Sequence, residues 1–408
     1  MRRLKEVIIS LTNRCNSECI ICDIPKEKTE ELSTSDCMRI IEDARLLGAS
    51  TVVFSGGEPL LRKDLFELIS FARNKHLKTC ITSNGLLLDD KAGFDLFTSG
   101  INVVNISLEG PKEVHDILRG KGSFKKALSA LDSLKKYNIE STIATMVSSY
   151  NYKYLKYVVE IAKEKGATTI KFQPFNILFL RDKSRKSEFL ISKKQAVELR
   201  QIVREIDSLC NKYGISTDPS AYLEQIPDYL SGNFPNHSQV CGALWESCPI
   251  DTKGNIYPCW VLGQEKNLIG NIKERAFVEL WDSDKHNAVR ELIKHKGCPG
   301  CMMSCYDYIF GGSSVKRRIA FNIGKLRRQG LFKYIRDTFK KWLKRLRFYS
   351  SYRGSLKAFK RRLKGVIRRR IPLGSQLNLK IKTNKREVET ALEEIALAEK
   401  MLKKAINK

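Results

Sequence analysis

The chain has 408 residues, of which 42% are hydrophobic and 29% are charged, and its formal net charge is +28. Its length allows one large domain with smaller additions, and its apolar fraction is that of a globular protein rather than a disordered one. No apolar run approaches the roughly 18 residues of a membrane-spanning helix, and no signal peptide is evident, so we expect a cytoplasmic protein whose cysteines are metal ligands or core residues rather than disulfides.

A predicted strand at residues 7–11 leads directly into a loop with three closely spaced cysteines, Cys15, Cys19 and Cys22. A 4Fe–4S cluster normally takes four protein thiolates, so three would leave one iron open to an outside ligand. The carboxyl end of a strand is also where α/β proteins place their active sites. A structural zinc loop is the alternative, although zinc usually takes two Cys-x2-Cys pairs and one gap here is three residues wide.

Strands and helices then alternate through the first half of the chain. The sequence predicts strands at residues 51–54, 79–82, 103–106, 142–147 and 168–172, and helices at residues 37–47, 65–75, 93–98, 124–137 and 152–165. Six strands that alternate with helices indicate a parallel sheet. Polar and glycine-rich turns follow consecutive strands, so we expect these turns on one rim of the sheet. The turn at 56–59 should present carbonyls and a carboxylate to a cationic group, because its glycines allow close approach.

The Cys-x3-Cys-x2-Cys loop, followed by Gly-Gly-Glu-Pro at 56–59, resembles the radical S-adenosylmethionine (SAM) superfamily. The resemblance covers roughly residues 5–215 and implies an α/β fold, a partial (β/α)6 TIM-like barrel in a domain at 1–215. It implies that Cys15, Cys19 and Cys22 hold a 4Fe–4S cluster and that SAM binds the fourth iron. It also implies an external one-electron reductant of the flavodoxin or ferredoxin type.

The same resemblance implies a set of residues that contact SAM. The implied set is Gly56, Gly57, Glu58, Pro59, Ser83, Asn84, Ser107, Glu109 and Arg119. The 56–59 turn would hold the SAM amino group, and Ser107 and Arg119 match positions that contact the ribose and carboxylate end. A guanidinium suits a carboxylate, although Arg119 as an ordinary surface charge is the alternative. The chain departs from the family pattern at Ile21, where relatives usually carry an aromatic residue, and at Glu109, where Asp is more frequent. No residue stands out as an acid, a base or a hydrogen donor.

Six further cysteines lie between residues 241 and 305, after a region at 180–235 that we expect to be looser. In a chain without a signal peptide they indicate metal ligands. The group resembles the SPASM or shorter twitch extension of radical SAM enzymes, which implies a small auxiliary 4Fe–4S domain at 236–310. The full SPASM pattern has further cysteines, so we expect one auxiliary cluster, and a four-cysteine zinc site is the alternative. The expected ligands are Cys241, Cys259, Cys298 and Cys301, with Cys248 and Cys305 in reserve.

Two further patterns complete this part of the chain. A turn and short strand are predicted before Cys259, and one helix is predicted at 276–293. The remaining three cysteines, Cys37, Cys80 and Cys210, lie in apolar helical or strand patterns and are predicted to be small core residues.

The positive charge is concentrated in residues 316–370, which hold 22 lysines and arginines against one acid, Asp337. Apolar residues such as Trp342 recur among these cations at helical spacing, so we predict a basic amphipathic helical segment at 311–372 and a final helix within 373–408. A basic amphipathic helix suits an anionic membrane surface and would place the protein at the inner face of the membrane. Nucleic acid as the partner and a solvated cap on the cluster domain are the alternatives.

The resemblance implies an enzyme that reductively cleaves SAM to a 5′-deoxyadenosyl radical and abstracts hydrogen from a substrate C–H bond. The candidate substrates are a membrane-associated lipid, a lipid-linked glycan and a peptide. One alternative is an RNA-modifying enzyme of the same family that binds RNA with its basic tail. The other is a metal-binding interaction protein without turnover, which the 56–59 turn and Ser107 disfavour because a scaffold needs no SAM pocket.

Overall fold

The computed structural model describes residues 4–27, 29–180, 182–234, 242–243, 245–263, 265–296 and 300–303. These residues belong to one compact unit, Met1–Arg317. A second unit, Arg318–Lys408, lies outside the described residues, and so do the predicted basic segment and final helix. Cys241, Cys298 and Cys305 also lie outside them. Within the described ranges, no helix has both the length and the apolar character needed to cross a membrane.

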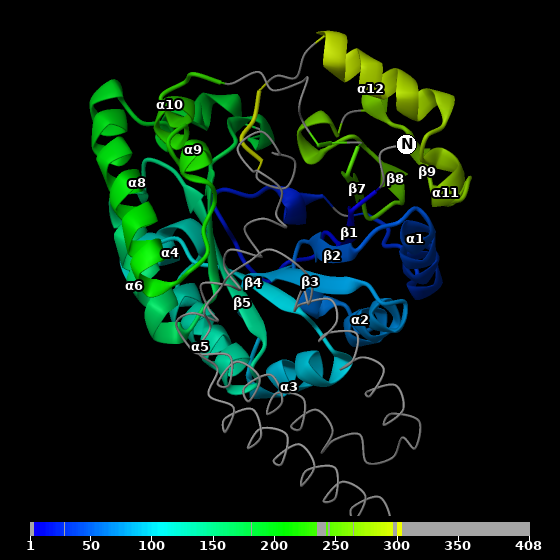
Figure 1. The fold of residues 1–408 in the computed structure, drawn as a ribbon, viewed down its shortest axis with the longest axis horizontal. Helices are drawn as coiled ribbons and strands as arrows, with labels where there is room; N and C mark the ends of the chain where they lie inside the picture. The colour runs from blue at the N-terminus through cyan, green and yellow to red at the C-terminus, as the bar shows by residue number, and fades with distance from the viewer. Residues whose placement is uncertain are drawn as a thin grey trace, which may run out of the picture. The chain divides into compact units, whose positions relative to one another are not determined.

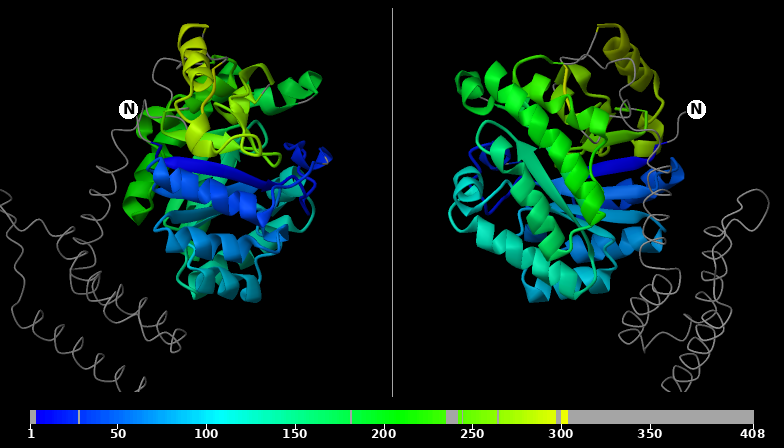
Figure 2. Two further views of the ribbon diagram at one scale, coloured as in Figure 1. Left: turned by 90° about the vertical axis from the view of Figure 1, so that its right-hand side faces the viewer. Right: turned by 60° about the vertical axis from the view of Figure 1, so that its left-hand side comes forward.

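Six parallel strands form a curved sheet in the first unit, with helices on its outer face (Figures 1 and 2). Each strand pairs with the next one along the chain. The strands are β1 (Glu6–Thr12), β2 (Thr51–Gly56), β3 (Lys78–Ser83), β4 (Val103–Ser107), β5 (Glu140–Val147) and β6 (Thr169–Pro174). The helices between them are α1 (Thr34–Leu46), α2 (Leu65–Asn74), α3 (Asp90–Ser99), α4 (Lys112–Arg119), α5 (Ser123–Lys136) and α6 (Leu155–Lys165). The predicted α/β partial barrel is confirmed, and α4 is an addition to the prediction.

The alternation of side chains along each strand explains the two faces of the sheet. Val52 and Phe54 of β2 and Ile81 of β3 are fully buried in one apolar core with the outer helices. The residues that alternate with them along the strands, such as Ser55 and Thr82, therefore point to the opposite, inner face of the barrel. Hydroxyl and amide side chains on that face make the interior of the barrel polar near its carboxyl rim.

The region at 180–235, which we expected to be looser, is helical, so that expectation is wrong. It contains α7 (Lys186–Phe189), α8 (Lys193–Tyr213), α9 (Ser220–Leu223) and α10 (Ile226–Leu230). The long helix α8 packs against α6 and buries one apolar face. It begins with a capping box in which Ser192 and Gln195 bond each other's backbone N–H groups, a signal that was readable in the sequence.

The second cysteine region is joined to the barrel through the sheet. Strand β7 (Ser247–Ile250) pairs in parallel with β1, and β8 (Asn255–Ile256) and β9 (Gly270–Asn271) continue the sheet with antiparallel pairing. The sheet order is therefore β6-β5-β4-β3-β2-β1-β7-β8-β9. The two regions that were predicted as separate domains share one sheet, in which β1 pairs with β2 on one side and with β7 on the other.

The helix predicted at 276–293 is two helices, α11 (Phe277–Leu280) and α12 (Asp284–Lys296). The helical conformation is interrupted at Asp282, whose backbone is left-handed with a φ of +64°. The ring Nδ1 of the fully buried His286 accepts a hydrogen bond from the Asp282 backbone N–H at 2.8 Å, and the ring packs against Trp281. The neutral imidazole thus holds the break between the two helices.

This burial predicts a pH dependence of stability. Burial, with a smaller effect from Arg290, lowers the pKa of His286 to about 3. The folded ring stays neutral, whereas the ring in the unfolded chain takes up a proton near pH 6.5, so the stability that His286 contributes is lost as the pH falls below 6.5. Between pH 6.5 and 5.5 we expect the free energy of unfolding to fall by about 1 kcal/mol more in the wild type than in His286→Gln, as measured by denaturant titration. Equal losses in the two proteins would contradict this assignment.

Candidate functional site

The three cysteines of the first group lie in one loop that follows the carboxyl end of β1. Cys15, Cys19 and Cys22 are half-buried and carry free thiols. The backbone N–H of Cys22 bonds to the Cys19 carbonyl at 3.2 Å, so the last two cysteines share a turn. Burial raises the pKa of the Cys15 and Cys22 thiols, an effect that a bound cation would reverse.

A single zinc ion and an iron–sulfur cluster require different spacings of the cysteine sulfurs. A zinc ion binds its sulfurs about 2.3 Å from one centre, so its ligands must lie close to one another. Within the part of the chain that the structure describes, no three Cys, His, Asp or Glu side chains are grouped closely enough for one ion. An iron–sulfur cluster binds each thiolate on a different iron and tolerates wider separations.

The two glycines at 56 and 57 bring the turn after β2 against the start of the cysteine loop. The Gly57 N–H bonds to the Thr12 carbonyl at 2.6 Å, and the Glu58 N–H bonds to the Arg14 carbonyl at 2.8 Å. A Cβ at Gly57 would collide with the Arg14 carbonyl, and a Cβ at Gly56, whose φ is +122°, would collide with that of Thr12. The glycines thus permit a backbone contact that fixes the residue before Cys15.

The carboxylate of Glu58 points into the protein and is bound by donors from neighbouring residues. Glu58 is fully buried, and its Oε1 accepts hydrogen bonds from Ser83 Oγ at 2.9 Å and from the Leu60 N–H at 3.1 Å. Its Oε2 accepts one from the Asn84 N–H at 2.8 Å. Glu58 therefore ties the turn after β2 to the end of β3.

Asn84 connects the end of β3 to the cysteine loop. Its Nδ2 lies 3.6 Å from Cys15 Sγ and 2.9 Å from the Oδ1 of Asn16. Its Oδ1 accepts a hydrogen bond from the Leu86 N–H at 2.8 Å, which fixes the amide group in this orientation. Two predicted site residues that are far apart in the chain, Cys15 and Asn84, are thus in contact.

Arg119 is not an ordinary surface charge, because it is paired with the fully buried Glu109. Arg119 Nη2 and Nε lie 2.5 Å and 2.7 Å from Glu109 Oε1. The other oxygen of Glu109 accepts a hydrogen bond from the Met146 N–H at 2.8 Å. The charge of Arg119 also acts on Cys19 and Cys22, so this pair lies beside the cysteine loop.

Two buried polar groups near the same rim were missed by the sequence analysis. His115 lies four residues before Arg119 on α4, and its Nδ1 accepts a hydrogen bond from the Glu109 N–H at 3.1 Å, so its Nε2 carries the proton. This Nε2, and Nδ2 of Asn176 directly after β6, are buried without a hydrogen-bond partner among the described residues. Ser107, at the end of β4, is buried on this rim as well.

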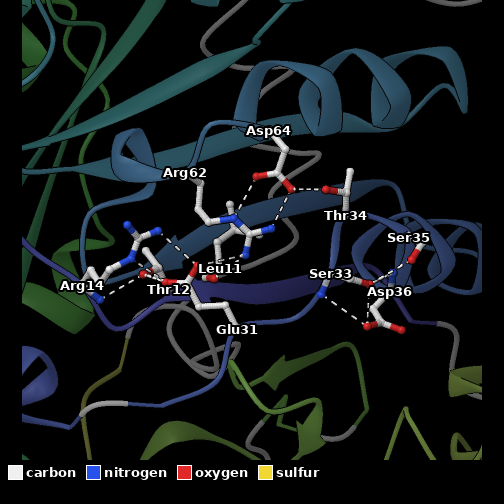
Figure 3. Close-up of polar contacts among 10 residues, drawn as sticks. All are labelled: Leu11, Thr12, Arg14, Glu31, Ser33, Thr34, Ser35, Asp36, Arg62 and Asp64. Carbon is white, nitrogen blue, oxygen red and sulfur yellow. Dashed lines mark hydrogen bonds and ion pairs between the residues drawn. The ribbon is translucent and has the colours of Figure 1, made fainter.

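Three polar side chains, Arg62, Asp64 and Glu31, hold the end of β1 and the start of the cysteine loop (Figure 3). Buried Arg62 donates from Nη1 to the Leu11 carbonyl at 2.8 Å and pairs with Asp64 at 2.6 Å. Glu31 accepts hydrogen bonds from Thr12 and from Arg14, whose Nε lies 2.8 Å away. The network fixes the direction in which the chain enters the loop.

The cysteines of the second group separate into two environments. Buried Cys259 and half-buried Cys301 lie in one small cluster with Ala243 and Met303. Gln173 Nε2, on the inner face of β6, lies 3.2 Å from Met303 Sδ, so this cluster lies against the barrel. Cys248 is instead fully buried in the main core, where desolvation raises its pKa, and it is separate from this small cluster.

Cys37 and Cys210 are fully buried in the main core, as predicted. Cys80 is half-buried on the inner face of β3 and is not part of the main core, so the core prediction is wrong for this cysteine. Desolvation raises the pKa of each of these three thiols to about 12, so they remain protonated.

Comparison with known proteins identifies both regions. The family model "Radical SAM superfamily" matches residues 9–162, and the SPASM model, described as an iron–sulfur cluster-binding domain, matches residues 241–306. The chain is 33% identical over 170 residues to Fe-coproporphyrin III synthase of Methanosarcina barkeri, a match that covers 41% of this chain and 43% of that protein. It is 29% identical over 311 residues to mycofactocin maturase MftC of Mycolicibacterium smegmatis, covering 74% and 76% of the two chains. The crystal structure of Streptococcus suis SuiB bound to the precursor peptide SuiA has the same fold, with a TM-score of 0.57 at 17% identity over 71% of this chain and 67% of SuiB.

Proposed function

This chain is a radical SAM superfamily enzyme that carries a SPASM iron–sulfur domain, and we propose that it acts on a neutral, polar substrate such as a peptide. The first domain binds a 4Fe–4S cluster and SAM, and the SPASM domain is a further cluster-binding domain, so the zinc alternatives and the non-catalytic alternative are set aside. When bound, the cluster and SAM supply reductive cleavage of the sulfonium to a 5′-deoxyadenosyl radical that abstracts hydrogen from the substrate, with the electron provided by an external flavodoxin- or ferredoxin-type donor.

We assign the first cluster to Cys15, Cys19 and Cys22. The observation that carries the proposal is the convergence of polar groups from the ends of β2, β3 and β4 on this one loop. Three thiolates cannot complete a four-iron cluster, so the loop leaves room for an outside ligand. The auxiliary cluster is assigned to Cys241, Cys259, Cys298 and Cys301; the packing of Cys259 with Cys301 supports this choice over the core residue Cys248.

The remaining residues of the rim would hold SAM. Two nitrogens of Arg119 are used by Glu109, and a guanidinium has further N–H groups that can bind the SAM carboxylate. In the assignment, the backbone of Gly56, Gly57 and Pro59 contacts the amino group and Ser107 contacts the ribose. Glu58, Ser83 and Glu109 act indirectly, because their hydrogen bonds are made within the protein. The unpaired Nε2 of His115 and Nδ2 of Asn176 are additional candidate donors.

The inner face of the barrel supports a neutral substrate. Near the rim it carries hydroxyl and amide groups from Ser55, Thr82, Asn105 and Gln173, and Asn105 donates to Thr82 Oγ1 at 3.1 Å. The charged residues of this face that the structure describes are Glu6, Lys78 and Glu140, each the first residue of its strand, and Lys171, in the middle of β6. Such a lining suits peptide amides better than the phosphate or carboxylate groups of a lipid or a tetrapyrrole. SuiB, which shares the fold, binds a precursor peptide.

The chemistry is tested by incubating anaerobically purified protein with dithionite and SAM. We expect 5′-deoxyadenosine, quantified by liquid chromatography, and its complete absence from protein with intact clusters would contradict the proposal.

The substrate class is tested by placing a photo-crosslinking amino acid at Thr82 and analysing the adducts formed in cells by mass spectrometry. A peptide adduct is expected, whereas a lipid or tetrapyrrole adduct would overturn the substrate assignment. Binding of residues 316–370 to an anionic membrane or to nucleic acid stays a sequence prediction.

A further inference from the structure

We infer that Asn84 is a positioning residue for the first cluster: its side-chain amide donates a hydrogen bond to the sulfur of Cys15 and so raises the reduction potential of the cluster. The inference rests on the proposed function only in taking Cys15 as a cluster ligand. It gives Asn84 a role toward the cluster sulfur rather than toward SAM.

The contact is held by hydrogen bonds from both ends of the Asn84 residue. Asn84 Nδ2 lies 3.6 Å from Cys15 Sγ, within the range of an N–H···S hydrogen bond. The backbone N–H of Asn84 donates a hydrogen bond to the Glu58 carboxylate, and the side-chain Oδ1 of Asn84 accepts one from the Leu86 N–H. The amide group is therefore oriented from two directions, and its NH2 end faces the cysteine loop. The backbone N–H of Ser17 is a second donor to the same sulfur.

The other polar side chain close to a cysteine sulfur in this loop is oriented differently. Ser17 Oγ lies 3.1 Å from Cys19 Sγ, but its single proton is donated to the Arg119 carbonyl at 2.8 Å. The hydroxyl proton of Ser17 is therefore used by a backbone carbonyl and is not available to the sulfur of Cys19. Asn84 differs because its NH2 group has two protons, one for Asn16 Oδ1 and one for Cys15.

The direction of the effect follows from charge. Reduction adds an electron to the cluster and increases the negative charge on its sulfurs, so a hydrogen-bond donor stabilises the reduced form more than the oxidised form. Loss of the donor should therefore make the cluster harder to reduce. Because SAM cleavage begins with a reduced cluster, Asn84 would lower the demand on the external electron donor.

The test is an EPR-monitored redox titration of the holoenzyme, in which the first cluster is recognised by the change of its signal on adding SAM. Asn84→Asp keeps an oxygen for the Leu86 N–H and removes the donor, and Asn84→Ser removes the amide without adding charge. We expect each variant to shift the reduction equilibrium at least about tenfold toward the oxidised cluster, which for one electron is about 59 mV. The shift should be larger in Asn84→Asp because its carboxylate adds negative charge. Asn74→Asp, an identical change at the exposed end of α2, should leave the potential unchanged.

An unchanged potential in the Asn84 variants overturns the inference while leaving the proposed function intact. Wild-type protein without iron, or without a signal that responds to SAM, refutes the proposed function instead. If the variants lose their clusters, a second measurement on the wild type decides. In protein labelled with ¹⁵N-asparagine, pulsed EPR should detect a nitrogen coupled to the reduced cluster, and the absence of this coupling also overturns the inference.

Discussion

Replacement of Cys15, Cys19 and Cys22 by alanine is expected to remove about half of the iron and sulfide from the protein and to abolish 5′-deoxyadenosine formation. Two 4Fe–4S clusters correspond to about eight irons per chain, of which about four should remain in the auxiliary cluster. The measurement is iron and sulfide analysis of anaerobically purified protein, with SAM cleavage followed in the same samples. The loss of 5′-deoxyadenosine formation should be complete because these three thiolates are the proposed protein ligands of the first cluster.

Cys210→Ala is the matched control, since Cys210 is a buried thiol in the core formed with α8. It should keep all of its iron and its SAM cleavage. Wild-type protein with about twelve irons would instead indicate two auxiliary clusters, and loss of all iron in the triple variant would contradict the assignment of the second cluster to a separate set of cysteines.

Gly57→Ala is expected to displace the cysteine loop and to slow SAM cleavage by about 100-fold, because a Cβ at this position meets the Arg14 carbonyl one residue before Cys15. Misplacement of a reacting group by about 1 Å costs on the order of 100-fold in rate. The same collision should lower the free energy of unfolding by about 1–3 kcal/mol, the usual cost of overpacking. Initial rates of 5′-deoxyadenosine formation and denaturant titrations measure the two effects.

Gly166→Ala separates the collision from ordinary glycine strain. Gly166 ends α6 with φ +76°, and a Cβ there would make only normal van der Waals contacts with Lys135. This variant should lose about 1 kcal/mol of stability from its left-handed backbone and cleave SAM at the wild-type rate. A Gly57→Ala protein with wild-type activity would show that the turn after β2 does not set the position of Cys15.

Much of the barrel could be predicted because its strands and helices have short, local signals. The β-branched runs at β2 and β5 and the apolar periodicity of α1 and α6 identify these elements without knowledge of their partners. The pairing of β7 with β1 could not be predicted, since it joins residues about 240 positions apart and depends on Ser247–Ile250, a four-residue strand. The break at Asp282 was missed for a different reason: it depends on a local hydrogen bond to the buried His286, which apolar periodicity does not reveal.

The candidate site was partly predictable. The resemblance to the radical SAM superfamily implied roles for Cys15, Glu58, Asn84, Glu109 and Arg119, and the structure places all five around one loop. Spacing alone could not give the direction of each side chain. Whether a carboxylate faces a ligand or the protein depends on neighbouring donors, which for Glu58 come from three different residues.

The position of β1 between β2 and β7 has a consequence for dividing this protein into parts. A fragment that ends before β7 would leave backbone groups of Glu6–Ile9 without their hydrogen-bond partners in β7, in a segment where three of the four side chains are apolar. Exposed strand margins of this kind recruit other chains and lead to aggregation. Attempts to exchange the auxiliary module between relatives should therefore carry β7 and β1 together, because the strand that delivers the first cysteine is completed by the module that follows.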